Sequence, residues 1–283
     1  MGRVFVSGST GFIGKVVVEK LLARGESVIG FSKTLGNDLM NYRDVEYSMK
    51  SCDRVIHCAA FVSFKTEDSQ EVAQINFVGT GNIMKAALVN KVKKMVFVSS
   101  AITRGISVKK DFFLSETCEV DTNNLRDAYT CSKIMAERLI VAGPVPASIV
   151  SPTTVNIPML IENFGNKKML IVPPGGTNII DVRDVAEGII AALDRGQDKE
   201  GYILSNVNIT YKDLAEKITG GHAFVLPRWS LRTAKYLARY VKDKYTSPFT
   251  ITNSYFYKYY SNIKARHEIG WEPKITLEEM IRR

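Results

Sequence analysis

The stretch Val4-Phe5-Val6-Ser7-Gly8-Ser9-Thr10-Gly11-Phe12-Ile13-Gly14 decides the fold of this 283-residue chain. Its short apolar start is typical of a buried β-strand. The segment Gly11–Arg24 that follows places Phe12, Leu21 and Leu22 on one helical face, which predicts an amphipathic helix. A strand, a glycine-rich turn and a helix are therefore expected to follow one another directly.

The three glycines of this turn are spaced as GxxGxxG rather than GxGxxG. Gly8 allows a tight turn, Gly11 lets backbone approach a ligand, and Gly14 lets the helix pack against the strand. The free N–H groups and the dipole at a helix N-terminus favour a phosphate at this point. The turn predicts the pyrophosphate site of a dinucleotide cofactor, and a glycine-rich turn without a ligand is the alternative.

Short β-branched runs alternate with longer amphipathic segments beyond the turn. Five strands are predicted, at Arg3–Ser7, Ser27–Phe31, Arg54–Cys58, Lys94–Ser99 and Ala147–Val150. Four helices are predicted, at Gly11–Arg24, Val72–Asn90, Tyr129–Val141 and Val185–Arg195. Near-continuous apolar strands that alternate with helices favour a parallel sheet covered on both faces, which right-handed crossovers make a doubly wound α/β fold of Rossmann type.

The pattern changes near residue 151, where prolines and glycines begin to cluster. We therefore predict that residues 1–150 form the Rossmann-type domain that binds the dinucleotide. A smaller, interleaved α/β lobe over residues 151–283 is expected to bind the substrate. Part of residues 178–205 is expected to return to the first domain.

The chain is rich in aromatic residues after Gly220. Ten of them are Trp229, Tyr236, Tyr240, Tyr245, Phe249, Tyr255, Phe256, Tyr257, Tyr259 and Tyr260. They predict an apolar pocket wall in the lobe, and simple core packing is the alternative. The expected pocket edges are Phe61–Lys65, Ile102–Ser107 and Ser151–Pro158.

Composition limits the classes of protein that fit. The chain is 45% hydrophobic and 24% charged, which is ordinary for one large globular domain or two intergrown ones. The four cysteines form no CxxC pair and only three histidines are present, so we expect no metal site and a reduced, cytoplasmic protein. We expect no signal peptide, because the first predicted strand starts within a few residues of Met1. We expect no membrane-spanning segment, because no apolar run reaches the roughly 18–20 residues needed to cross a bilayer.

The net charge of +9 is concentrated late in the chain, where residues 228–283 hold twelve Lys/Arg and five Asp/Glu. No nucleic-acid-binding signature accompanies this charge, so we expect a small-molecule substrate and no nucleic acid partner. Ser230–Lys244 is predicted to be a basic amphipathic helix. Its apolar stripe is Leu231, Ala234, Leu237 (or Ala238) and Val241. Packing of this stripe on the lobe is favoured over contact with a membrane surface, and a homodimer is left open.

The end of the second predicted strand indicates which cofactor is bound. A carboxylate at this point would accept from the ribose 2′-OH of NAD. The chain instead has Ser32 and Lys33, which can donate to and neutralise a 2′-phosphate. We therefore predict NADP rather than NAD, with an ordinary surface lysine as the alternative.

A second group of residues, Tyr129 and Lys133 with the serines at the end of a strand, is typical of acid–base chemistry. Tyr129 and Lys133 are four residues apart, so they share one face of the predicted helix. A nearby ammonium is expected to lower the pKa of the tyrosine hydroxyl, which makes it a usable acid–base group. The strand Lys94–Ser99 leads to Ser99 and Ser100, whose hydroxyls could share a substrate oxygen with Tyr129. The pair alone is also compatible with a helix that merely buries the ring.

The chain resembles the extended short-chain dehydrogenases/reductases, the NAD-dependent epimerase/dehydratase superfamily. The resemblance covers nearly the whole chain and rests on Gly8-x-x-Gly11-x-x-Gly14, Asp38-Leu39, His57-Cys58-Ala59-Ala60, Asn76, Val98-Ser99-Ser100-Ala101, Tyr129-x-x-x-Lys133, Ile180–Ala186 and Lys264–Pro273. Between Phe31 and Asp38 only a few residues remain, so the family's third strand is expected to be very short or absent. The run Pro152-Thr153-Thr154-Val155 is similar to the dihydroflavonol reductase and 3β-hydroxysteroid dehydrogenase branch.

The resemblance implies a role for each matching residue. Tyr129 would be the acid/base, Lys133 would bind the nicotinamide ribose, Ser100 would orient the substrate oxygen and Asn76 would support the site. The implied cofactor contacts are Gly8, Thr10, Gly11, Phe12, Ile13, Gly14, Ser32, Lys33, Asp38, Leu39, Cys58, Ala59, Ala60, Ser99, Tyr129, Lys133, Pro152 and Thr153.

The predicted activity is an NADP-dependent oxidoreductase, either a ketone or aldehyde reductase or an alcohol dehydrogenase. Its expected substrate is a fairly apolar small molecule, selected by apolar walls rather than fixed charges. The first alternative is a nucleotide-sugar epimerase or dehydratase that retains NAD. The second is a non-enzymatic NADP(H)-binding regulator, against which the intact Ser–Tyr–Lys set argues.

Overall fold

The structure is a computed structural model that describes residues 2–118, 127–155, 169–240 and 246–282. A six-stranded sheet with the order β2-β1-β3-β4-β5-β8 forms its centre, and every neighbouring pair in it is parallel. Its strands are β1 (Arg3–Ser7), β2 (Ser27–Phe31), β3 (Cys52–His57), β4 (Lys94–Val98), β5 (Ala147–Pro152) and β8 (Gly201–Leu204). The predicted doubly wound Rossmann-type fold is confirmed.

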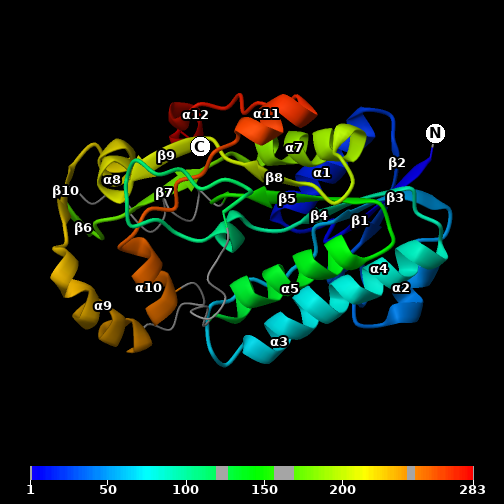
Figure 1. Cartoon of the computed structure of the whole chain (residues 1–283), viewed down its shortest axis with the longest axis horizontal. Helices are drawn as coiled ribbons and strands as arrows, with labels where there is room; N and C mark the ends of the chain where they lie inside the picture. The colour runs from blue at the N-terminus through cyan, green and yellow to red at the C-terminus, as the bar shows by residue number, and fades with distance from the viewer. Residues whose placement is uncertain (1, 119–126, 156–168, 241–245, 283) are drawn as a thin grey trace.

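Helices cover both faces of this sheet (Figure 1). One layer consists of α1 (Phe12–Ala23), α7 (Val182–Arg195) and α11 (Ile263–Ile269). The other consists of α2 (Tyr42–Ser48), α3 (Ser69–Ala73), α4 (Gly79–Val89) and α5 (Ala128–Ala142). The strands serve both layers because successive side chains point to opposite faces: Val4 and Val6 join the core under α1 and α7, whereas Phe5 joins the core under α4 and α5.

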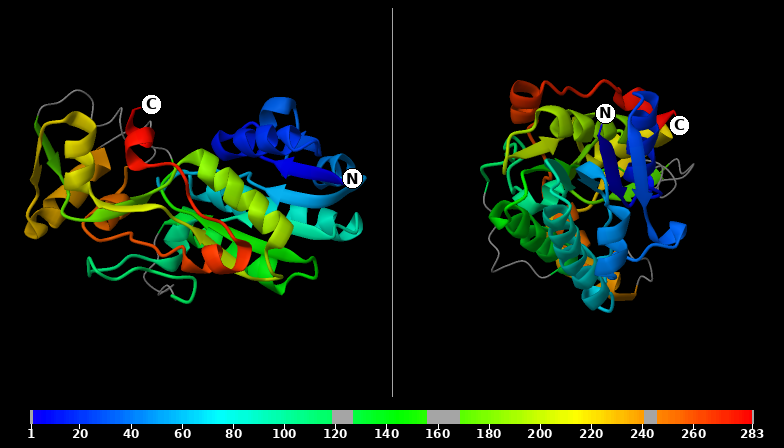
Figure 2. Two further views of the ribbon diagram at one scale, coloured as in Figure 1. Left: turned by 90° about the horizontal axis from the view of Figure 1, so that it is seen from above. Right: turned by 90° about the vertical axis from the view of Figure 1, so that its right-hand side faces the viewer.

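The remaining elements gather at one end of the molecule (Figures 1 and 2). They include a parallel pair, β6 (Met169–Val172) with β10 (His222–Val225), and an antiparallel pair, β7 (Gly176–Ile179) with β9 (Val207–Thr210). The helices at this end are α8 (Tyr211–Thr219), α9 (Leu231–Leu237), α10 (Pro248–Ser254) and α12 (Leu277–Ile281). We call this end the lobe. Although they follow residue 151 in the chain, β8, α7 and α11 pack with the central sheet. The division into two domains stays a prediction.

Several predicted boundaries differ from the structure. The predicted helix Val72–Asn90 consists of α3, a π-helical turn at Gln74–Val78 and α4. The third strand of the family was expected to be very short or absent. The sheet indeed ends at β2, and a short 3₁₀ turn at Lys33–Leu35 follows it. The short, polar helix α2 was not predicted, because its seven residues carry little apolar periodicity.

The described residues bear on three expectations, which concern disulfides, metal ions and membrane spans. All four cysteines are free. Within the described ranges, no cluster of three or more His, Cys, Asp or Glu side chains is placed to hold a metal ion. No helix in the described part of the chain is long and apolar enough to cross a membrane.

Candidate active site

The glycine turn joins β1 to α1 in a conformation that needs its glycines. Gly8 has a φ of +67°, and its N–H donates to the Phe31 carbonyl oxygen at 2.8 Å. A Cβ on Gly14 would collide with the Gly8 carbonyl oxygen, so this glycine sets the close approach of helix and turn. Gly11 is the N-cap of α1 and offers no side-chain cap, which leaves the first N–H groups of the helix free for an anion.

A cavity of about 570 Å³ begins at this turn. It lies at the carboxyl ends of the strands, where the sheet order reverses between β1 and β3, which is the usual ligand position in doubly wound folds. The predicted residues that line it are Gly8, Gly11, Phe12, Ile13, Gly14, Cys58, Ala60, Ser99, Ser100, Tyr129, Lys133, Pro152 and Thr153. Tertiary folding therefore brings the glycine turn and the Ser–Tyr–Lys set into one space.

The buried Tyr129 hydroxyl differs from the prediction in its pKa. Burial raises this pKa to about 12, and a side-chain hydrogen bond with Ser100 acts in the opposite direction. Lys133 is not among the groups that shift it; its buried ammonium donates to the Val98 carbonyl oxygen at 2.8 Å and lies 4.9 Å from the centre of the Phe97 ring. The expected lowering of the tyrosine pKa by Lys133 is thus wrong for this structure, because desolvation of the phenolate outweighs the other effects.

Helix α5 begins where it does because Asp127 caps it. The Asp127 side chain accepts a 2.7 Å hydrogen bond from the Thr130 backbone N–H. This cap places Tyr129 in the first turn and Lys133 one turn later, on the face that closes the cavity. The predicted four-residue spacing therefore produces the expected juxtaposition.

Asn76 does not line the cavity but supports it. Its side-chain oxygen accepts from the Phe61 N–H at 2.7 Å, and its amide donates to the Phe61 carbonyl at 3.0 Å and to the Ser132 hydroxyl at 3.1 Å. The buried Asn76 thus ties the loop after β3 to α5. This supporting position was expected, and its functional role stays a prediction.

Phe64 connects the lobe with the tyrosine. Its ring meets the Tyr129 ring edge-on, with 5.3 Å between the centroids, and stacks on Phe249 at 6.3 Å. Phe249 belongs to α10, whose Thr250 and Asn253 line the same cavity. The lobe therefore forms the wall opposite the glycine turn.

The cavity wall contains residues that the sequence did not single out. They are Thr177, Tyr211, Thr250, Asn253 and Lys258. Ten aromatic residues were expected to form an apolar wall, and one of them, Tyr245, lies outside the described residues. Among the other nine, only Tyr260 lines this cavity. Thr250, Asn253 and Lys258 lie within the aromatic run, which was the available signal for them, and no sequence signal marked Thr177 or Tyr211. The edges expected at Phe61–Lys65, Ile102–Ser107 and Ser151–Pro158 contribute Val62, Phe64, Ile102, Pro152, Thr153, Thr154 and Val155.

The predicted adenine end lies beyond this cavity. Ser32 is buried, and its hydroxyl meets the hydroxyls of Thr10 and Thr34 at 3.0 Å each. The Lys33 side chain next to it is exposed. The predicted contacts that do not line the cavity are Thr10, Ser32, Lys33, Asp38, Leu39 and Ala59. Asp38 and Leu39 follow the short turn after β2, and their cofactor role stays a prediction.

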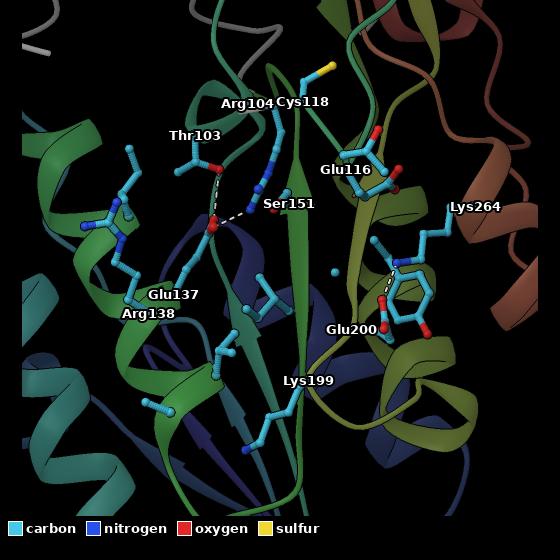
Figure 3. Close-up of a pocket in the computed structure, with 17 residues that line it drawn as sticks. Thr103, Arg104, Glu116, Cys118, Glu137, Arg138, Ser151, Lys199, Glu200 and Lys264 are labelled. Atoms are coloured by element: carbon cyan, nitrogen blue, oxygen red, sulfur yellow. Dashed lines mark hydrogen bonds and ion pairs between the residues drawn. The ribbon is translucent and has the colours of Figure 1, made fainter. Parts of the chain in front are cut away.

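A second, more polar pocket of about 880 Å³ shares no lining residue with the first (Figure 3). Glu137 of α5 lines this pocket, and its carboxylate accepts hydrogen bonds from the Thr103 hydroxyl at 2.8 Å and from the Arg104 guanidinium. The same carboxylate accepts from the Ser99 hydroxyl at 2.5 Å. On the opposite wall, Lys264 pairs with Glu200 at 2.5 Å. The hydrogen bonds of Glu137 therefore join α5 to the segment that follows β4.

Comparison with known proteins agrees with this geometry. Residues 4–209 match the family model described as the NAD dependent epimerase/dehydratase family. The chain is 26% identical to the sterol-4-alpha-carboxylate 3-dehydrogenase, decarboxylating, of Bos taurus over 99% of this chain and 90% of that protein. It is 24% identical to the 3-beta-hydroxysteroid dehydrogenase of Mycolicibacterium neoaurum over 99% and 89% of the two chains.

A solved structure with the same fold is the UDP-glucose 4-epimerase of Thermus thermophilus in complex with NAD. It is 21% identical, covers 99% of this chain and 96% of its own, and has a TM-score of 0.77. This likeness shows the fold alone.

The Rossmann-type sheet, the glycine turn and the cavity beside it define a nucleotide-dependent α/β enzyme. The chain belongs to the NAD dependent epimerase/dehydratase family, as an NAD(P)-dependent enzyme of the extended short-chain dehydrogenase/reductase type.

Proposed function

We propose that the protein is an NADP-dependent oxidoreductase that interconverts a carbonyl and an alcohol on a fairly apolar small molecule. The observation that carries this proposal is that Ser100, Tyr129 and Lys133 line the same cavity as the glycine turn. When bound, the nicotinamide supplies or accepts the hydride. The uncapped start of α1 and the close approach at Gly14 fit the pyrophosphate of such a cofactor.

Ser100 and Tyr129 position the substrate and transfer the proton. Ser100 and Tyr129 hold the substrate oxygen between two hydroxyls, so the carbonyl carbon faces the cofactor side of the cavity. In reduction, the Tyr129 hydroxyl gives its proton to that oxygen as the new C–H bond forms, and in oxidation it takes the proton back. A pKa near 12 keeps this hydroxyl protonated at neutral pH, which is the form that reduction needs.

The cavity wall supports an apolar substrate. Val62, Phe64, Ile102 and Val155 supply hydrocarbon surface, and hydroxyl and amide groups such as those of Thr250 and Asn253 lie among them. The names of the bovine and mycobacterial relatives, a sterol-carboxylate and a hydroxysteroid dehydrogenase, point to the same class of molecule.

One fixed charge in the wall refines the expected substrate. Lys258 lines the cavity, with its ammonium 5.9 Å from the centre of the Tyr211 ring and no carboxylate within ion-pair distance among the described residues. An ammonium between apolar surfaces favours a ligand that carries a carboxylate or another anion. The name of the bovine relative combines these two features, a sterol and a carboxylate. Apolar walls therefore act together with one charge, rather than alone as the sequence suggested.

Tyr129→Phe tests the proposed chemistry. The variant should lose about 10²–10⁴-fold in turnover of a carbonyl panel, because it removes the proton donor, while NADPH still quenches protein fluorescence as in the wild type. Tyr47→Phe, at an exposed tyrosine on α2, is the matched control. Undiminished turnover would overturn the mechanism, and NAD that stays bound through purification would favour the epimerase alternative.

A further inference from the structure

The lobe carries an exposed surface of aromatic and basic residues that the proposed chemistry does not use. It comprises α9 with its flanking 3₁₀ turns at Arg228–Ser230 and Ala238–Tyr240, and lies at the end of the molecule far from β2 (Figures 1 and 2). We call residues 228–240 the lobe-end face. Trp229 is 80% exposed, Tyr236 56% and Tyr240 69%. Several large aromatic side chains exposed on one short segment mark an interaction surface, whereas a single exposed ring does not.

The helix presents this face because its buried side is occupied by other residues. Ala238 is buried and Leu231 and Ala234 are half-buried, so the helix packs through these positions. Leu237, predicted as an alternative to Ala238 in the buried stripe, is instead 57% exposed. The correct alternative was Ala238, and Val241 lies outside the described residues.

Three exposed aromatic residues lie on α9 or directly beside it. Tyr236 and Tyr240 are four residues apart, with their rings 5.6 Å apart and their hydroxyls at 3.1 Å. Trp229 lies in the 3₁₀ turn directly before α9, and Tyr240 lies in the one directly after it. Exposed aromatic side chains therefore occur at both ends of the helix as well as on it.

Exposed basic residues occur in the same segment. Arg232, Lys235 and Arg239 follow one another at spacings of three and four, and all three are exposed. No Asp or Glu occurs anywhere between Gly220 and Tyr240. The lobe-end face is thus apolar and cationic without a compensating anion of its own.

The chemistry of this face selects its partner. Trp and Tyr favour the boundary between lipid headgroups and hydrocarbon, and Lys and Arg are attracted to anionic headgroups. A second copy of the chain in a symmetric contact would oppose these cations to themselves, which is unfavourable. We propose that the lobe-end face binds the surface of a membrane that contains anionic lipid.

The position of the face relative to the cavity is consistent with this role. Helix α9 packs on α10, and the Ser230 hydroxyl meets the Tyr255 hydroxyl at 2.7 Å. Helix α10 in turn supplies Thr250 and Asn253 to the cavity wall. Docking through α9 therefore brings the substrate wall to within one helix layer of the lipid, where apolar molecules concentrate.

Vesicle binding by the full chain tests the inference. Vesicles of phosphatidylcholine mixed with phosphatidylglycerol should sediment the protein, and vesicles of phosphatidylcholine alone should sediment far less of it. Replacing Arg232, Lys235 and Arg239 together by Gln should lower the partition coefficient at least about tenfold, as should high salt. Replacing Lys50, Lys91 and Lys93 together by Gln removes the same number of charges from exposed lysines outside the lobe-end face. This control variant should bind vesicles within about twofold of the wild type.

The two tryptophans allow a second, direct readout. Trp271 is only 3% exposed, whereas Trp229 is on the surface, so a change in emission on adding vesicles reports Trp229. Anionic vesicles should shift this emission to the blue, and brominated lipid should quench it. Trp229→Phe should abolish the shift, and Tyr47→Ser on α2, which removes an equally exposed ring, should keep it.

Three results would overturn the inference. One is equal sedimentation of the wild type and the Arg232/Lys235/Arg239 variant with anionic vesicles. Another is a dimer in sedimentation equilibrium that the same variant converts to a monomer, because the face would then cover a second copy. The third is tight binding of RNA with no binding of vesicles. Since none of these measurements uses turnover, they are independent of the proposed reaction.

Discussion

The Ser99 hydroxyl donates a 2.5 Å hydrogen bond to the Glu137 carboxylate, and this bond joins the end of β4 to the middle of α5. Ser99 immediately precedes Ser100, and Glu137 lies one helical turn after Lys133. The bond therefore fixes the distance between the strand that carries the serine and the helix that carries the tyrosine and lysine. A buried carboxylate can do this because Arg104 and Thr103 satisfy its other lone pairs.

Glu137→Ala should misplace Ser100 relative to Tyr129. The variant leaves two hydroxyls and a guanidinium without their acceptor, so we expect the free energy of unfolding to fall by about 1–3 kcal/mol, measured by urea denaturation. We expect kcat to fall more than KM rises, because the change affects the reacting groups rather than the walls. Glu137→Gln keeps an oxygen acceptor for Ser99 and should recover part of the activity.

Glu187→Ala is the control for this experiment, since Glu187 forms an exposed ion pair with Lys20 on α1. It should leave both stability and kcat close to those of the wild type. Equal losses from Glu137→Ala and Glu187→Ala would contradict a positioning role for Glu137.

Lys133 should give the protein a characteristic pH dependence of stability. Burial lowers the pKa of Lys133 to about 8, against an ordinary value of 10.5. Between these values the unfolded chain binds more protons at this residue than the folded chain, so its contribution to the free energy of unfolding rises with pH. The difference in unfolding free energy between the wild type and Lys133→Met should therefore increase from about pH 8 to about pH 10.5, as followed by urea denaturation. The same difference for Lys85→Met, at an exposed lysine on α4, serves as the control. A flat or falling difference for Lys133 would contradict the prediction.

Cofactor preference tests the residues that follow β2. Titration of nicotinamide fluorescence should show tighter binding of NADPH than of NADH, because Ser32 and Lys33 can receive a 2′-phosphate. Lys33→Glu should reduce that preference by about tenfold, as expected when a charge-assisted contact of roughly 1.5 kcal/mol is lost. Lys50→Glu changes the net charge equally at an exposed position before the amino end of β3, whereas Lys33 follows the carboxyl end of β2, and it should leave the ratio unchanged. Tighter binding of NADH by the wild type would refute the NADP assignment.

Lys258 should discriminate between charged and neutral substrates. For an apolar ketone that carries a carboxylate, Lys258→Met should raise KM by about ten- to a hundredfold, since a hydrogen bond to a charged group is worth roughly 1.5–3 kcal/mol. The methyl ester of the same ketone should be used equally by both proteins. Lys212→Met, at an exposed lysine on α8, controls for charge alone. An equal effect on acid and ester would show that Lys258 acts through packing.

Local sequence patterns predicted the fold and the proposed reactive set. The apolar run before Gly8 and the helical spacing after it predicted β1 and α1, and both signals depend on neighbouring residues only. The spacing of Tyr129 and Lys133 likewise placed both side chains on one face of α5, because four residues make about one helical turn. The apolar strand before Ser99 and Ser100 pointed to a hydroxyl at its end, and the family resemblance chose Ser100.

Long-range packing decided the rest. The wall formed by Tyr211, Thr250, Asn253 and Lys258 comes from lobe segments whose positions no local period encodes. Burial, which depends on the whole surroundings of a group, raised the pKa of Tyr129 where sequence spacing alone suggested that it would fall. The same dependence left Trp229 and Tyr240 on the surface, although their composition suggested a pocket wall. A sequence states which side chains are available, and only tertiary contacts determine which of them lose their water.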